Sequence, residues 1–148
     1  MFCAEGPLCG LKGGMRMTER IAEWIRGWIG GALEVETERT QLRPGMMGVY
    51  RCGRKTRLEH PDGGFEEVHR FALEVCLSGL TGAERADGAA LLEAIEAQIA
   101  KKDVEGDLPA IDGMDCWRAE IVSGFCMKTG GAAERVYRAE MDIYCEVM

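Results

Sequence analysis

The segment from Glu66 to Ser78, EEVHRFALEVCLS, constrains the fold of this chain more than any other stretch. Apolar residues occupy every second position from Phe71 to Leu77, and polar residues such as Arg70 and Glu74 stand on the alternate positions. Successive side chains of a strand point to opposite faces of a sheet. The pattern therefore predicts a strand with one buried and one solvated face.

A helix and two further strands are predicted after this strand. Leucine and isoleucine recur at helical spacing over residues 83–101, where Gly88 indicates close packing on the sheet. Alternation returns over residues 116–127 and 135–147, on either side of the turn KTGGAAE, and predicts two antiparallel strands. Their predicted apolar faces, packed beneath the helices, are the odd-numbered residues Trp117, Ala119, Ile121, Phe125 and Met127, and Tyr137, Ala139, Met141, Ile143, Cys145 and Val147.

The N-terminal half is predicted to begin with an amphipathic helix capped by Thr18 and ended by Gly30 and Gly31. Its apolar stripe is expected to pack in the core, because its polar face lacks the basic character that binds anionic lipid; the stripe comprises Ile21, Trp24, Ile25, Trp28 and Ile29. Strands are predicted over 33–40 and 46–53, with a polar hairpin tip over 60–64.

These elements together predict one α+β domain over residues 17–148, in the order α-β-β-β-α-β-β. We expect a mixed, mainly antiparallel sheet covered on one face by two helices. A chain of 148 residues with 47% hydrophobic content can bury a core without metals or disulfides. Residues 1–16 show no periodicity and are interpreted as a flexible leader or an over-extended gene start.

The charge of the chain argues against nucleic acid as a partner. Asp and Glu number 25 against 18 Lys and Arg, which gives a formal net charge of −7. An acidic protein repels the phosphate backbone unless a basic patch with interleaved aromatic residues compensates, and no such patch is found. No apolar run approaches the roughly 18–20 residues of a membrane span, so we expect a cytoplasmic location.

The chemistry-bearing residues do not form a recognisable metal or catalytic motif. The chain has only two histidines and no C-x-x-C pair, so we expect neither a metal nor a cofactor, and reduced, mostly buried thiols at Cys76, Cys116, Cys126 and Cys145. The acidic segment 103–114 does not match a calcium-binding loop. No nucleophile elbow, phosphate loop or dinucleotide fingerprint is present, and no catalytic residue is predicted.

Two charged clusters are the candidate interaction sites. The basic cluster consists of Arg51, Arg54, Lys55 and Arg57, and the acidic cluster of Asp103, Glu105, Asp107 and Asp112. The basic cluster is interpreted either as a solvated arm or as a contact with an acidic protein neighbour. Neither reading requires a cleft, since charge complementarity can give specificity on an open surface.

Several short phrases resemble small phage and prophage proteins of the minor capsid or tail-terminator type. The phrase GDLPAI, over residues 106–111, is similar to the GNLP-L phrase of that group, although Asp107 replaces its asparagine. The phrase VSGFC, over 122–126, is similar to T-S-G-Y-L, and RVYRAEMDIYCEV resembles the group's final strand. The resemblance covers residues 17–148, and the aromatic W-x-E-type phrase that follows the helix in many relatives is missing.

The resemblance implies a structural role rather than catalysis. It implies a subunit of a ring, such as a hexamer, at the neck of a long-tailed phage, which closes the tail tube and joins it to the head. The partners would be copies of the same chain and other tail or head–tail connector proteins, and the two charged clusters would form the subunit interface. A small cytoplasmic domain that binds a peptide or small ligand on its open sheet face, without catalysis, is the alternative.

Overall fold

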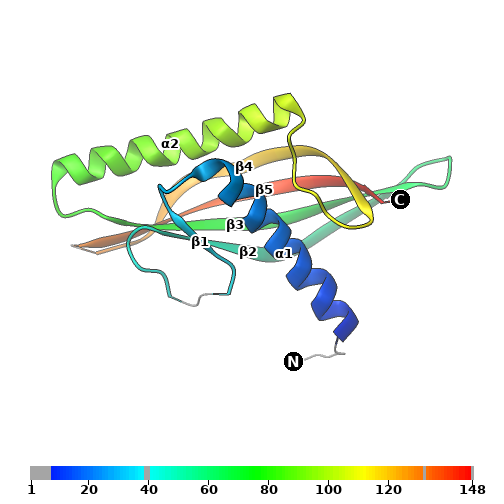
Figure 1. Cartoon of the computed structure of the whole chain (residues 1–148), viewed down its shortest axis with the longest axis horizontal. Coiled ribbons are helices and arrows are strands. Elements are labelled where there is room, and N and C mark those ends of the chain that lie inside the picture. The colour runs from blue at the N-terminus through cyan, green and yellow to red at the C-terminus, as the bar shows by residue number, and fades with distance from the viewer. Residues whose placement is uncertain (1–7, 39–40, 132, 148) are drawn as a thin grey trace.

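The computed structural model describes residues 8–38, 41–131 and 133–147 of the chain. Its elements are α1 (Leu8–Ile29), β1 (Glu34–Glu36), β2 (Met46–Glu59), β3 (Phe65–Ser78), α2 (Gly82–Glu105), β4 (Met114–Gly130) and β5 (Glu134–Val147) (Figure 1). The predicted α+β class, with a mixed sheet and two helices, is confirmed. The predicted element order is also the observed one.

The described strands form one five-stranded sheet in the order β1-β2-β3-β5-β4. Only the short β1 runs parallel to its neighbour β2, and the other three pairings are antiparallel. β3 and β5 pair along their whole lengths, from Phe65 opposite Val147 to Ser78 opposite Glu134. The alternating segment over residues 66–78 therefore lies inside the sheet, with β2 on one side and β5 on the other.

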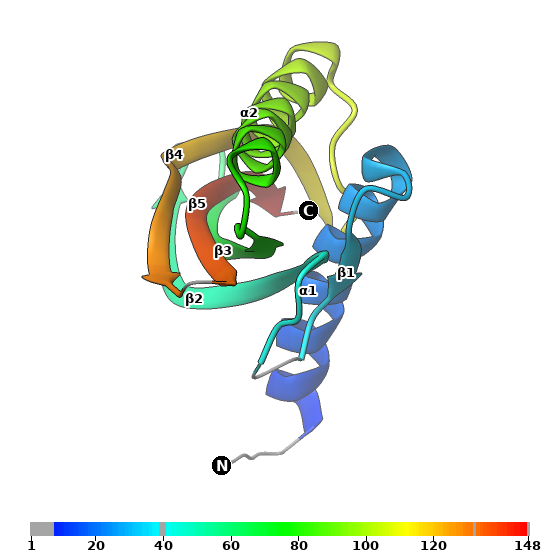
Figure 2. The same cartoon turned by 90° about the vertical axis from the view of Figure 1, so that its left-hand side faces the viewer.

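The helices share one hydrophobic core with the odd-numbered residues of the sheet. α1 packs mainly against β1 and β2, whereas α2 packs mainly against β4 and β3, and Figure 2 shows the sheet curled beside both helices. The core includes Ile21 and Ile25 of α1, three residues of α2 and the strand residues Phe71, Leu73, Val75, Met141 and Ile143. Burial of this apolar surface is the main source of stability.

Local chemistry fixes both ends of α2. Thr81 accepts a hydrogen bond from the backbone N–H of Glu84, whose side chain accepts one from the backbone N–H of Thr81, so a capping box begins the helix. Gly106 ends it in the left-handed conformation, with φ at 74°. Gly88 faces the sheet as predicted: a Cβ at this position would lie 3.1 Å from Cδ1 of Leu77.

The structure corrects the predicted start of the first helix. α1 begins at Leu8 rather than at an N-cap on Thr18, so residues 8–16 of the predicted flexible leader are helical, and residues 1–7 lie outside the described part. Glycine inside a helix costs only about 1 kcal/mol relative to alanine, which the remaining turns can offset.

The buried faces predicted for β5, β4 and β3 agree with the structure to different degrees. In β5, Ala139, Met141, Ile143 and Cys145 are fully buried, as predicted. In β4 the prediction is wrong for Trp117 and Met127, which are exposed, because register irregularities on this strand interrupt the alternation. β3 is buried on both faces from Phe71 to Cys76, rather than on one.

Three predicted boundaries also change. β1 ends at Glu36 and residues 39–40 of the predicted strand lie outside the described part. β2 continues to Glu59, so its basic residues belong to a strand, and the hairpin tip follows at 60–64 as predicted. α2 extends to Glu105, so Asp103 and Glu105 are helical and not part of a loop.

Candidate functional site

The β2–β3 hairpin projects beyond the end of the sheet (Figure 1). Its tip is a closed turn, in which the N–H of His60 donates to the carbonyl of Gly64 at 2.7 Å and the N–H of Gly63 donates to the carbonyl of His60 at 3.0 Å. His60 Nε2 also lies 2.6 Å from Oε2 of Glu66. A tip held by this many local contacts is preorganised, so docking it against a partner costs little ordering entropy.

The outer edge of β2 is open over most of its length. β1 pairs only with Met46–Gly48, and within the described residues no strand pairs with the outer side of β2 from Val49 to Glu59. An open strand edge presents unpaired N–H and C=O groups that can template pairing with another chain. Here a register irregularity between Arg51 and Lys55 and the basic residues interrupt that edge, so uncontrolled pairing is disfavoured.

The basic cluster is built on this open edge. Arg51 donates from Nη2 to Nδ1 of the buried His69 at 3.0 Å, which leaves the Nε2–H of His69 to donate to Oε1 of Glu67 at 3.1 Å. The guanidinium of Arg57 stacks over the ring of Phe65, 3.8 Å from its centroid. Arg54 and Lys55 belong to β2, but their side chains lie outside the described part. The sequence predicted the basic cluster, but it did not predict that Arg51 contacts the buried His69 and, through it, Glu67.

The acidic cluster lies at the C-terminal end of α2 and in the loop that follows. Asp103 accepts a hydrogen bond from the backbone N–H of Ala119 at 2.9 Å, and Asp107 forms an ion pair with Lys102 at 2.8 Å. Asp112 is 65% exposed and 3.8 Å from Arg20, and Glu105 is exposed. Glu105 and Asp112 are therefore the carboxylates of this cluster that a neighbour could approach most easily.

The two charged clusters lie at the same end of the sheet. The basic cluster follows the β2 edge, whereas the acidic cluster lies between the start of β4 and α1, where Asp112 is 3.8 Å from Arg20 and the carbonyl of Asp107 accepts a hydrogen bond from Trp24. β3 and β5 separate β2 from β4, and at this end Phe65 pairs with Val147, which pairs with Met114. The basic and acidic surfaces thus belong to different elements of the fold, β2 for the first and the end of α2 with the following loop for the second.

The edge formed by β4 differs from the β2 edge because α2 covers part of it. Oδ1 of Asp103 accepts the N–H of Ala119, and Oε2 of Glu96 accepts the N–H of Phe125, each at 2.9 Å. The backbone N–H groups that donate to these carboxylates are therefore not available to pair with a neighbouring strand. Sheet extension along this stretch of β4 is therefore disfavoured, and its contacts with a neighbour should involve side chains.

Sequence reasoning missed the apolar residues exposed on the two outer strands. They are 46–55% exposed and comprise Leu58 of β2 and Trp117, Val122 and Met127 of β4. The ring of Trp117 lies 5.3 Å from the ring of Tyr144, measured between centroids. Exposed apolar side chains beside charged ones are typical of interaction surfaces. A strand prediction based on strict alternation could not find those on β4, because irregular register exposes them.

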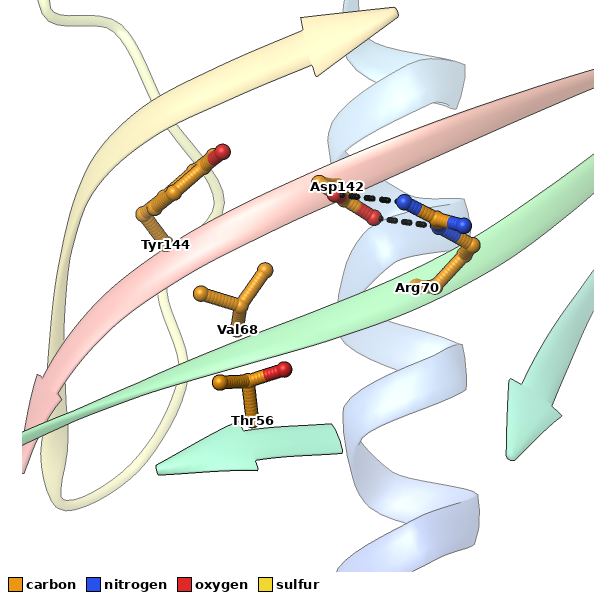
Figure 3. Close-up of a pocket in the computed structure, with 5 residues that line it drawn as sticks. All are labelled: Thr56, Val68, Arg70, Asp142 and Tyr144. Atoms are coloured by element: carbon orange, nitrogen blue, oxygen red, sulfur yellow. Dashed lines mark hydrogen bonds and ion pairs between the residues drawn. The ribbon is translucent and has the colours of Figure 1, made fainter. Parts of the chain in front are cut away.

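The helix-free face carries a charged network over a small pocket (Figure 3). Arg70 binds Asp142 through two hydrogen bonds, from Nε at 2.7 Å and from Nη2 at 3.0 Å, and these bonds raise the pKa of Arg70. The pocket holds about 210 Å³ and is lined by these two residues with Thr56, Val68 and Tyr144. A second hollow of about 470 Å³ lies between α2 and β4. Neither is an enclosed apolar cavity, and the first is lined by an ion pair that is already satisfied.

Glu74 is the buried anion of the same face. Its Oε2 accepts hydrogen bonds from Nζ of Lys128 at 2.8 Å and from Nη1 of Arg138 at 2.9 Å. Burial by itself would raise the pKa of Glu74, but the two cationic donors outweigh it and hold the pKa below 4.5. The ionised form is thus favoured by folding.

Replacing Glu74 with glutamine should therefore destabilise the protein in a pH-dependent way. We expect a loss of about 1.5–3 kcal/mol at pH 7, because two charge-assisted hydrogen bonds are weakened. The difference from the wild type should persist above pH 4.5 and shrink as the pH falls through the lower pKa of folded Glu74. Urea unfolding at several pH values measures it. Glu93→Gln, at an exposed position on α2, is the control and should stay within about 0.5 kcal/mol.

Comparison with known proteins adds no identification. No protein-family model matches the chain, and no curated protein is detectably similar to it. Within the described residues, neither helix combines the length and apolarity that a membrane crossing requires. The same residues include no group of three or more His, Cys, Asp and Glu side chains arranged to hold a metal ion.

Proposed function

We propose that the chain is a structural component of a long-tailed phage or prophage virion, a tail-terminator-like protein that joins head and tail and has no catalytic role. The observation that carries the proposal is the open basic edge of β2, with its projecting hairpin, in a molecule that carries a separate acidic cluster at the C-terminal end of α2 and in the loop that follows. Such a molecule can bind a copy of itself through two different surfaces. The partners are then further copies and other connector proteins, in the host cytoplasm and later in the virion.

Contacts between unlike surfaces determine the type of assembly. When the basic edge of one copy meets the acidic cluster of the next, each copy leaves one surface of each kind for a further neighbour. A heterologous contact of this kind produces a closed ring if the rotation between copies closes, and a filament if it does not. A ring such as a hexamer suits a protein that closes a tube.

Sequence resemblance and surface shape both support this role over the ligand-binding alternative. The phrase GDLPAI follows the C-terminus of α2 and VSGFC lies in β4, in the element order that the phage group is expected to share. Small-molecule sites are usually concave, mostly apolar and about 300–1,000 Å³ in volume. The pocket on the helix-free face is smaller, at about 210 Å³, and its charged groups pair with each other. The hollow between α2 and β4 falls within this range at about 470 Å³, but it is open to solvent and its Glu96 already binds the backbone of β4.

Light scattering on the purified chain tests the proposal. We expect a mass above the 16.3 kDa of one chain, which rises with protein concentration towards a limiting value, and closed rings in electron micrographs of the assembled material. Higher salt should lower the measured mass, because salt screens the attraction between the exposed charges of two copies. The screening length is about 8–10 Å at physiological ionic strength and becomes shorter as the salt concentration rises. A mass of 16.3 kDa at every protein and salt concentration would argue against self-assembly.

A further inference from the structure

Two thiols lie side by side at the end of the sheet that carries the charged clusters. Cys116 of β4 and Cys145 of β5 are register partners, and their Sγ atoms are 3.3 Å apart. Cys145 is fully buried, and Cys116 is only partly buried. The pair thus combines one thiol that a reagent can reach with a second that is held directly beside it.

The strands hold this pair in a geometry that suits a disulfide. Residues directly opposite each other on antiparallel strands have Cα atoms about 4.5–5.5 Å apart, within the roughly 4.4–6.8 Å that disulfides span. Two further register pairs, Met114 with Val147 and Asp115 with Glu146, fix the strands on one side of the cysteines. The sulfur atoms need only a small rotation about their side-chain bonds to form a covalent bond.

The other described cysteines lack this arrangement. Cys52 accepts a hydrogen bond from Arg138 at 3.5 Å, Cys76 is buried, and Cys126 is exposed on β4. Among the described residues, Cys116 and Cys145 alone have thiols within hydrogen-bonding distance of each other. The prediction of mostly buried thiols is therefore right for Cys76 and Cys145, whereas Cys126 is exposed.

We propose that Cys116 and Cys145 form a reversible disulfide when the protein meets a small-molecule disulfide oxidant. The thiolate of Cys116 attacks one sulfur of the oxidant, the oxidant's S–S bond breaks, and one thiolate leaves. The Cys145 sulfur then attacks Sγ of Cys116 and expels the second thiolate, while its proton passes to solvent. The protein dithiol loses two electrons and two protons in total, and the oxidant is reduced to two thiols.

The electrostatics of the pair agree with this order of attack. The hydrogen bond with Cys145 lowers the pKa of Cys116, so the more accessible sulfur is the one that ionises more easily. The same hydrogen bond, together with burial, raises the pKa of Cys145, which therefore stays protonated until Cys116 has reacted. The resulting disulfide would join the outer strand β4 to β5, beside the loop that bears part of the acidic cluster.

Peptide mapping after oxidation tests the proposal directly. The dilute protein is treated with oxidised glutathione, remaining thiols are alkylated, and trypsin then places Cys116 on peptide 103–118, Cys126 on 119–128 and Cys145 on 139–148. We expect peptides 103–118 and 139–148 to be joined, with the mass of both less two hydrogen atoms. The joined species should form on the order of tenfold faster than any product of Cys126 and disappear with dithiothreitol.

Two variants make the result specific. Cys116→Ser should abolish the joined species, and Cys126→Ser, on the same strand, should leave its rate unchanged. A stable glutathione adduct on Cys116 without linkage to Cys145, or equal linkage of Cys126, would overturn the proposal. The reaction is intramolecular and is measured at low concentration, so its outcome is independent of whether the chain assembles as proposed above.

Discussion

Replacing Phe71 with alanine is expected to lower the free energy of unfolding by about 3–5 kcal/mol. Phe71 is fully buried at the centre of β3, between Arg51 of β2 and Met141 of β5, on the face that both helices cover. Truncation removes a large apolar side chain and leaves a cavity that the paired strands cannot collapse into. Since a domain of this size is stable by about 5–15 kcal/mol, the loss is a large fraction of the total stability.

Urea unfolding followed by circular dichroism measures this loss, and Phe125→Ala is the matched control. Phe125 lies on the outer strand β4 and is only partly buried, so its truncation should cost about 1–2 kcal/mol. An equal or larger loss for Phe125→Ala would mean that the core is not centred on β3.

Reversing the charge of the basic edge should prevent self-assembly. In the double variant Arg54→Glu and Arg57→Glu, the net charge of the basic cluster falls from +4 to zero, and two carboxylates on the β2 edge would face the acidic cluster of the next copy. We expect the association to weaken by about 100-fold, equivalent to about 2.7 kcal/mol, because opposed like charges at an interface are strongly unfavourable. Sedimentation velocity at low salt measures the change in the fraction assembled.

The control for this variant is Arg43→Glu with Lys101→Glu. Both residues are exposed, neither belongs to the basic cluster, and the net charge changes by the same amount. If the control dissociates the assembly as strongly as Arg54→Glu and Arg57→Glu, net charge and not the basic edge governs association. Unchanged circular dichroism spectra would show that each variant is folded.

Periodicity in the sequence predicted the elements of this fold because each one packs a regular face. In β5, four of the predicted residues are buried as alternation requires, Ala139, Met141, Ile143 and Cys145, while Tyr137 and Val147 are partly buried. In α1 the buried Ile21 and Ile25 lie on the predicted stripe. Alternation failed where long-range structure decides burial. β3 is buried on both faces because the helices cover one face and long side chains of β4 and β5, Lys128 and Arg138, reach Glu74 on the other. β4 departs from alternation at its register irregularities.

The candidate site was predictable in composition but not in arrangement. Charge runs showed where basic and acidic residues gather along the chain, since the members of each run are close in sequence. Three contacts depend on how the elements pack and could not be read from charge runs. Arg51 contacts the buried His69, Asp103 binds the backbone of β4, and Asp112 lies 3.8 Å from Arg20 of α1. Contacts such as that between Cys116 and Cys145 depend on strand register in the same way.

Mixing two complementary variants tests the proposed interface most directly. One variant carries Arg54→Glu and Arg57→Glu, and the other carries Glu105→Lys and Asp112→Lys in the acidic cluster. Each alone should remain at the 16.3 kDa of a single chain, because one of its two clusters has lost its net charge and opposes like charges at the altered positions. In an equimolar mixture the copies can alternate, so that the altered positions of one variant face opposite charges on the other, and light scattering should show assembly restored towards the wild-type mass. A mixture of two folded variants that stays at 16.3 kDa, while the wild type assembles, would contradict the account.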